Sequence, residues 1–88
     1  MYCIYVISSE IKKYIYVGLT NDFKRRFNQH QEGRNKTTRI YRPFKLILKE
    51  EFQTRLEARD REKYLKSGSG KEWIKKGLTH RAGPNESE

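Results

Sequence analysis

The stretch Cys3–Gly18, CIYVISSEIKKYIYVG, decides the fold. It lies within two apolar runs, residues 2–7 and 14–19, which are rich in β-branched and aromatic residues and are separated by a polar break at residues 8–13. Runs of this composition predict strands, the first of them buried on both faces, and the break between them predicts a β-hairpin. Because the break holds no Asn-Gly or Asp-Gly pair, we expect a longer loop than a two-residue turn.

A short helix is predicted over residues 23–31. Capping residues at positions 20–22 precede it, and Gly33 ends it. The next segment, residues 33–42, is basic and lacks apolar periodicity, which predicts a surface loop of the kind that often binds ligands. A third strand is predicted over residues 44–52, with a proline just before it, where a missing hydrogen-bond donor costs little.

Two more helical segments complete the predicted order. The capping box at Thr54–Glu57 begins a helix that ends at about residue 66, and residues 71–76 add one or two further turns. The order β-β-α-β-α-α predicts one domain of the α+β class over residues 2–78. Residues 79–88 contain Gly-Pro and end in acidic residues, and we expect them to form a flexible tail.

The charge of the chain is strongly positive and unevenly distributed. Twenty Lys and Arg residues stand against eleven Asp and Glu residues in 88, which gives a net charge of +9. Between residues 24 and 49 the only acidic residue is Glu32. Such a local excess indicates a polyanionic partner, nucleic acid above all, although a solvated basic surface that merely keeps the protein in solution has the same composition. The basic residues of this segment are Lys24, Arg25, Arg26, Arg34, Lys36, Arg39, Arg42, Lys45 and Lys49.

Several classes of function are excluded by motifs that the sequence lacks. One cysteine, Cys3, and two histidines, His30 and His80, provide neither an internal disulfide nor the ligand spacing of a zinc site. There is no P-loop, no Rossmann glycine pattern and no nucleophile elbow. No apolar run approaches the ~20 residues of a membrane span, so we expect a cytoplasmic protein without a membrane partner.

The chemistry that remains is that of Tyr, Arg, His and Glu in a basic setting. Ala58, Glu62 and Leu65 fall on one face of their helix, and a carboxylate on an inward face is costly unless it is paired or bound to a metal. Arg26 and His30 form a stripe at the edge of the docked face of the first helix. This set suits phosphodiester hydrolysis, in which a carboxylate holds a divalent cation and an arginine stabilises the charge on phosphate. An ion pair between Glu62 and Arg26 is the alternative explanation.

Three blocks of the sequence, taken in order, resemble a known family. Cys3-Ile4-Tyr5, followed after ten residues by Tyr16-Val17-Gly18, resembles the GIY-YIG nuclease signature. Thr20–His30 is similar to the family's next block, in which Arg26 lies ten residues after the second tyrosine. Arg61–Trp73 is similar to the closing segment of small single-domain members related to the nuclease domain of the excinuclease C subunit.

The resemblance covers about residues 2–76 and implies a metal-dependent DNA endonuclease, with DNA repair as its setting, built on a three-stranded antiparallel sheet flanked by helices. By position, Glu62 would hold Mg²⁺ or Mn²⁺ and Arg26 would clamp the phosphate. Tyr5 and Tyr16 would position or activate the attacking water, with His30 near the scissile phosphate. The partner implied is nucleic acid, DNA rather than RNA. The residues expected to contact it are Lys24, Arg25, Arg34, Lys36, Arg39 and Arg42.

Two positions depart from the family pattern, and they motivate other hypotheses. Cys3 stands in place of the first glycine of the signature, and Leu19 stands where relatives of excinuclease C carry a lysine. A nucleic-acid-binding module that has lost useful turnover is therefore an alternative to the nuclease. A subunit that takes its specificity from a protein partner is a third reading, with Trp73-Ile74 or the tail as the interface.

Overall fold

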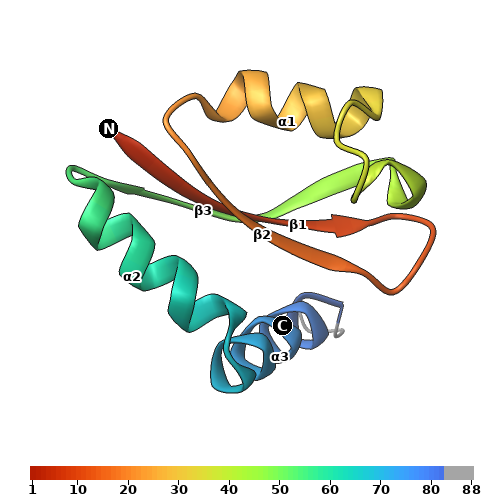
Figure 1. Cartoon of the computed structure of the whole chain (residues 1–88). Coiled ribbons are helices and arrows are strands. Elements are labelled where there is room, and N and C mark those ends of the chain that lie inside the picture. The colour runs from red at the N-terminus through yellow and green to blue at the C-terminus, as the bar shows by residue number, and fades with distance from the viewer. Residues whose placement is uncertain (83–88) are drawn as a thin grey trace.

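The structure, a computed structural model, describes residues 1–82 of the chain and the side chains of residues 1–77. Its elements follow the order β-β-α-β-α-α with one short 3₁₀ turn, so the predicted α+β class is confirmed (Figure 1). The elements are β1 (Tyr2–Ser9), β2 (Ile15–Thr20), α1 (Phe23–Glu32), η1 (Arg39–Tyr41), β3 (Phe44–Phe52), α2 (Arg55–Lys66) and α3 (Gly68–Ala82).

The three strands form one antiparallel sheet, as expected, and their order in it is β2-β1-β3. The hairpin loop is long, as predicted, and is held by the hydroxyl of Ser9, which accepts hydrogen bonds from the backbone N–H groups of Ile11 and Lys12. Tyr5 pairs with Gly18, and two residues further along β1, Ile7 pairs with Tyr16. Because alternate residues of a strand share a face, Tyr5, Tyr16 and Gly18 lie on the same face of the sheet.

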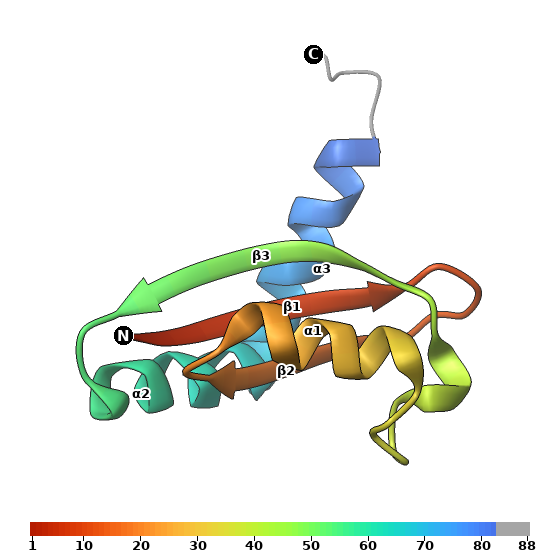
Figure 2. The same ribbon diagram turned by 90° about the horizontal axis from the view of Figure 1, so that it is seen from above.

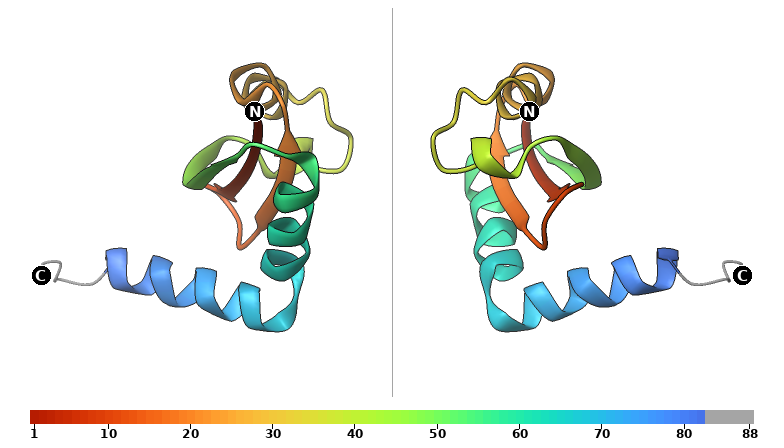
Figure 3. Two further views of the ribbon diagram at one scale, coloured as in Figure 1. Left: turned by 90° about the vertical axis from the view of Figure 1, so that its left-hand side faces the viewer. Right: turned by 90° about the vertical axis from the view of Figure 1, so that its right-hand side faces the viewer.

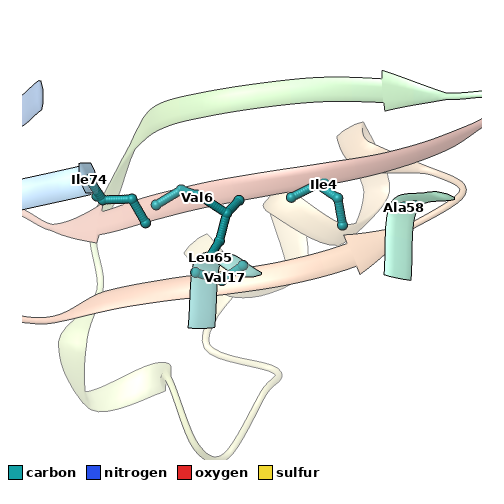
Figure 4. Packing of buried hydrophobic residues seen from close by; sticks show 6 residues of the cluster. All are labelled: Ile4, Val6, Val17, Ala58, Leu65 and Ile74. Atoms are coloured by element: carbon teal, nitrogen blue, oxygen red, sulfur yellow. The ribbon is translucent and has the colours of Figure 1, made fainter. Parts of the chain in front are cut away.

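Helices cover both faces of the sheet, with α1 on one side and α2 on the other (Figures 1 and 2). On the α2 side an aliphatic cluster is buried, which includes Ile4 and Val6 of β1, Ala58 and Leu65 of α2, and Ile74 of α3 (Figure 4). The alternate residues of β1 point the other way and pack with α1. This second cluster contains Cys3, Tyr5, Ile7 and Phe44, with Phe23 and Phe27 packed against it.

Short-range hydrogen bonds form the predicted caps of α1 and α2. Asp22 caps α1 by accepting from the N–H of Arg25, and Gly33 follows the helix with a positive φ of 80°. Thr54 caps α2 in a complete capping box. Residues 67–70 were predicted only to end α2, but Ser67 also accepts from the N–H of Gly70 and caps α3.

Helix α3 is longer than the two turns predicted for it. It covers fifteen residues and turns sharply away from the end of α2 (Figure 3). Gly70 makes that turn feasible, because a Cβ there would overlap the carbonyl of Tyr64. Residues 79–82 of the predicted tail are the last turn of α3, and residues 83–88 lie outside the described residues. None of the described helices is both long enough and apolar enough to cross a bilayer.

Candidate active site

Tyr5 lies at the centre of the candidate site and is completely enclosed by its neighbours. Its ring contacts Tyr16 and the edge of Phe23, at centroid distances of 6.1 and 5.7 Å. Gly18, opposite it on β2, makes room for the phenol, because a Cβ at this position would overlap the end of the Tyr5 ring. The final glycine of the Tyr-Val-Gly motif is therefore explained by the packing of the first tyrosine.

His30, in the last turn of α1, is also fully buried and has a partner on each ring nitrogen. Nε2 lies 2.9 Å from the Tyr5 hydroxyl, and Nδ1 lies 2.9 Å from the hydroxyl of Thr38. Burial, with the charge of Arg26 as a second cause, lowers the pKa of His30 to about 4. The imidazole is therefore neutral at pH 7, so that one nitrogen donates and the other accepts.

Thr38 is a member of the site that sequence reasoning missed. It precedes η1, is fully buried, and links the basic loop to His30 through its hydroxyl. No spacing rule marks it, since it lies in a loop without periodicity. One sequence signal could have indicated it. A buried histidine needs a hydrogen-bond partner on each ring nitrogen, and a hydroxyl in a nearby loop can be the second partner.

Arg26 and Tyr16 form the more accessible part of the site, since both side chains are only partly buried. The guanidinium of Arg26 lies within electrostatic and hydrogen-bonding reach of the Tyr5 and Tyr16 hydroxyls. Burial alone would lower the pKa of Arg26, but the two phenols outweigh it and raise this pKa. For Tyr5, burial raises the pKa of the phenol, and the opposing effect of Arg26 is smaller. Arg26 also donates to Oε1 of Gln29 at 3.2 Å, which helps to hold the guanidinium in place.

Glu62 comes from a different helix than Arg26 and His30. It belongs to α2, which packs against the opposite face and closely along edge strand β2 (Figure 1). Its side chain is only 17% exposed, which agrees with an inward carboxylate, and its ion-pair partner is Lys66, at 3.0 Å, rather than Arg26. The structure therefore gathers Tyr5, Tyr16, Arg26 and His30 but places Glu62 on a helix across the sheet from them.

Glu62 would supply a single protein carboxylate to a metal ion, not a cage of protein ligands. Among the side chains of residues 1–77, no group of three or more His, Cys, Asp or Glu gathers at one point. Mg²⁺ commonly takes one or two carboxylates and completes its coordination with water and substrate phosphate. Lys66, whose side chain is 54% exposed, is a flexible partner that can move away from the Glu62 carboxylate when a cation replaces it.

The six residues expected to contact nucleic acid are all exposed and belong to α1 and the loop that follows it. Three of them, Lys24, Arg25 and Arg34, lie around a shallow depression on α1 together with Asp22 and Glu32. Arg25 pairs with Asp22 at 3.6 Å, and Arg34 pairs with Glu32 at 2.9 Å. Part of the positive charge predicted for this surface is thus balanced by acidic neighbours. The other three, Lys36, Arg39 and Arg42, lie on the loop and around η1.

The two departures from the family pattern have clear structural settings. Cys3 is buried and pairs regularly with Thr20 and Glu51, so a side chain is accommodated at this point of β1 without a break in the sheet. Leu19 packs against the aliphatic cluster on the α2 side, where an unpaired lysine ammonium would be costly to bury.

Comparison with known proteins yields one family and several relatives. Residues 1–76 match the family model described as the GIY-YIG catalytic domain. A relative named UPF0213 protein YazA, from Bacillus subtilis, is 42% identical over 52 residues, which cover 58% of this chain and 52% of the relative. A UPF0213 protein of Limosilactobacillus reuteri is 41% identical over 68 residues, which cover 74% of this chain and 70% of that protein. One from Staphylococcus saprophyticus is 36% identical over 62 residues, covering 69% of this chain and 76% of the relative.

The extent of these matches varies. The chain spans about half the length of YazA and of a further relative from Bacillus velezensis, and about 70% or more of the other two. No solved structure matches the chain significantly.

Proposed function

The chain belongs to the GIY-YIG family of nucleases, and on that premise we propose that it is a divalent-metal-dependent endonuclease that hydrolyses phosphodiester bonds in DNA. One observation carries the proposal beyond family membership. Tyr5, Tyr16, Arg26 and His30 come from three different elements and meet on one face of the sheet. A cluster of phenols, imidazole and guanidinium next to exposed basic residues suits the binding of a phosphodiester.

Within this proposal Arg26 and Tyr16 act on the substrate. Arg26 donates hydrogen bonds to the phosphate and stabilises the charge that grows on it in the transition state. Tyr16, partly exposed and on the edge strand, orients the attacking water through its hydroxyl. Hydrolysis forms a bond from the water oxygen to phosphorus and breaks the bond from phosphorus to the leaving sugar oxygen.

Tyr5, His30 and Thr38 then act beneath the substrate as positioning residues. Since Tyr5 is fully buried and its pKa is raised by burial, the phenol stays protonated at neutral pH. It therefore orients its neighbours by hydrogen bonding and does not remove a proton from water. His30, neutral and held on both sides, fixes the position of the Tyr5 hydroxyl next to Arg26.

Glu62 would hold the divalent cation, Mg²⁺ or Mn²⁺. A cation bound there supplies neutralisation of a phosphoryl oxygen and of the leaving oxygen. Tyr16 lies on edge strand β2, and α2 packs along the same strand from the opposite face. The β2 edge is therefore the place where groups from the two faces of the sheet would act on one phosphate.

The test is a cleavage assay on supercoiled, branched and single-stranded DNA, and on RNA, with Mg²⁺ or Mn²⁺. We expect Glu62→Gln to lower the rate by about 100-fold or more, because the variant lacks the charged ligand of the cation. Glu72→Gln, at an exposed position of α3, is the matched control and should cut like wild type. If wild type cuts no substrate, or Glu62→Gln cuts as well as wild type, the proposal fails.

A second candidate is a nucleic-acid-binding module of the same fold without useful turnover. It is favoured by the two departures from the family pattern, Cys3 and Leu19, and by the packing of α2 on the sheet face opposite to α1 (Figure 1). In this case Glu62→Gln leaves binding intact or strengthens it, because removal of a negative charge near phosphate lowers repulsion. Metal-dependent cleavage that disappears in Glu62→Gln would exclude this candidate.

A further inference from the structure

A lysine-lined cleft lies between the tip of the β1–β2 hairpin and α3. Its lining residues Ile15 and Val17 belong to the sheet face opposite to the Tyr5 cluster. Figures 1 and 3 show where the hairpin and α3 lie. Its volume is about 740 Å³. One wall comes from the hairpin and the other from the first turns of α3. The residues that line it are Ser8, Lys12, Lys13, Tyr14, Ile15, Val17, Lys71, Ile74 and Lys75.

The charge of this cleft has one sign only. Lysines line both walls, Lys12 and Lys13 on the hairpin and Lys71 and Lys75 on α3, and none of the described lining residues is acidic. The depression on α1 differs, because its lining includes the acidic residues Asp22 and Glu32. Lysines brought together from two separate elements repel one another, and a polyanion between them relieves that repulsion.

The floor of the cleft indicates which part of a nucleic acid it suits. Ile15, Val17 and Ile74 are aliphatic and offer no hydrogen bonds to base edges. The ring of Tyr14 is stacked on Tyr41, with centroids 3.8 Å apart and an interplanar angle of 5°, so one of its faces is already covered. The recognition available here is ionic and independent of sequence, as for a phosphate backbone.

We propose that this lysine-lined cleft binds the phosphodiester backbone of a single-stranded arm of the nucleic acid whose cleavage is proposed above. Its lining residues Ser8, Ile15 and Val17 alternate along the hairpin with Ile7 and Tyr16, which face the Tyr5 cluster. A nucleic acid held at both places must pass from one face of the sheet to the other, around a domain whose smallest dimension is 22 Å.

That path selects the kind of substrate. Duplex DNA has a persistence length of about 150 base pairs, so wrapping it around so small a domain is costly, whereas a single strand bends freely. The cleft therefore favours a duplex that carries a single-stranded arm over a blunt duplex. This inference rests on the proposed function only in taking nucleic acid as the ligand.

The experiment measures binding by fluorescence anisotropy in EDTA, so that no cleavage occurs. Its probes are a blunt duplex and the same duplex with a single-stranded arm. Lys13→Gln/Lys71→Gln should weaken binding of the armed duplex several-fold and leave the blunt duplex unchanged. The salt slope for the armed duplex should fall by about 1.4, since each lost phosphate contact on a single strand contributes about 0.7.

The matched control is Arg59→Gln/Lys63→Gln, which removes the same charge from exposed positions of α2 outside the cleft. It should not distinguish the two probes. Equal loss on both probes, or no loss on the armed duplex, overturns the inference. The inference is also overturned if Lys13→Gln/Lys71→Gln weakens the binding of poly-glutamate but not that of the armed duplex. The occupant of the cleft would then be an acidic polypeptide.

The outcome is separable from that of the proposed function. If Glu62→Gln abolishes cleavage while Lys13→Gln/Lys71→Gln binds both probes like wild type, the proposed nuclease function is supported and the proposed role of the cleft is rejected. If no substrate is cut but binding of the armed duplex depends on the two lysines, the proposed role of the cleft is supported and the proposed nuclease function is rejected.

Discussion

The two faces of the sheet are buried to a similar degree by different chemistry. The α2 face is filled by aliphatic side chains such as Ile4, Val6 and Leu65. The α1 face holds Tyr5 and His30, and His30 makes hydrogen bonds to both Tyr5 and Thr38. Aliphatic packing stabilises in proportion to the area buried, whereas buried polar groups are costly unless each is paired. The comparison indicates that one face serves mainly stability and the other is arranged for the candidate site.

The largest effect on the aliphatic face should come from Leu65→Ala. Leu65 is fully buried at the contact of α2 with the sheet. Its truncation should lower the free energy of unfolding by about 2–5 kcal/mol and the Tm by roughly 10 °C or more, since the cavity left behind cannot collapse fully. Thermal and urea unfolding measure this effect.

The control for that prediction is Leu56→Ala, at a position on the same helix that is 73% exposed. It should change the free energy of unfolding by no more than about 0.5 kcal/mol. Equal losses of unfolding free energy at Leu56 and Leu65 would show that the two positions are not buried differently. The conclusion that aliphatic packing on the α2 face stabilises the fold would then fail.

On the α1 face, Gly18→Ala should have the next largest effect. The new Cβ would overlap the Tyr5 phenol, which cannot move without losing its hydrogen bond to His30. We expect a loss of about 1–3 kcal/mol in the free energy of unfolding. Because Tyr5 adjoins Arg26 and Tyr16, cleavage should fall as well at temperatures where the variant is folded.

Gly77→Ala is the matched control, since a Cβ at this exposed position of α3 meets nothing within 4 Å. It should stabilise the helix by about 0.5–1 kcal/mol, because glycine is the poorer helix former. If Gly18→Ala keeps wild-type stability and cleavage, a glycine is not needed at position 18 to make room for the Tyr5 ring.

Much of the fold could be predicted from short-range patterns. The apolar runs around the hairpin, the Thr54–Glu57 capping box and Gly33 each act within a few residues, so local sequence was sufficient to locate them. The length of α3 was underestimated, because Ser67 and Gly70 are typical of a break and here form a cap and a close helix contact. That contact depends on Tyr64 in another helix, which no local pattern reveals.

The candidate site could be predicted only in part. Helical periodicity indicated that Arg26 and Glu62 point toward the sheet. It does not indicate which face of the sheet each of them points toward, because helices cover both faces. Nothing in the spacing says that α1 and α2 lie on opposite faces of the sheet (Figure 1). That Arg26 and Glu62 act on one phosphate therefore stays a prediction. The lysine-lined cleft was missed for the same reason, since Lys13 and Lys71 are far apart in the sequence.

The smallest predicted effect concerns the protonation of His30. Its pKa of about 4 in the folded state lies below the ordinary value of 6.5, because burial disfavours the charged imidazole. The unfolded chain therefore binds more protons than the folded protein between pH 4 and 6.5, so the free energy of unfolding falls as the pH drops through this window. The loss should reach up to about 2 kcal/mol at pH 5. Unfolding measured at pH 7 and at pH 5 tests it, and His30→Gln should show the weaker dependence.

An NMR titration gives the same prediction without a variant. The sequence holds two histidines, and the resonance assigned to His30 should titrate near pH 4. A midpoint near 6.5 would mean that water or an acidic group reaches the imidazole, since neither burial nor the charge of Arg26 permits an ordinary value. The α1 face would then be open at its centre, and Tyr5 would be able to reach the attacking water directly rather than through the position of its neighbours.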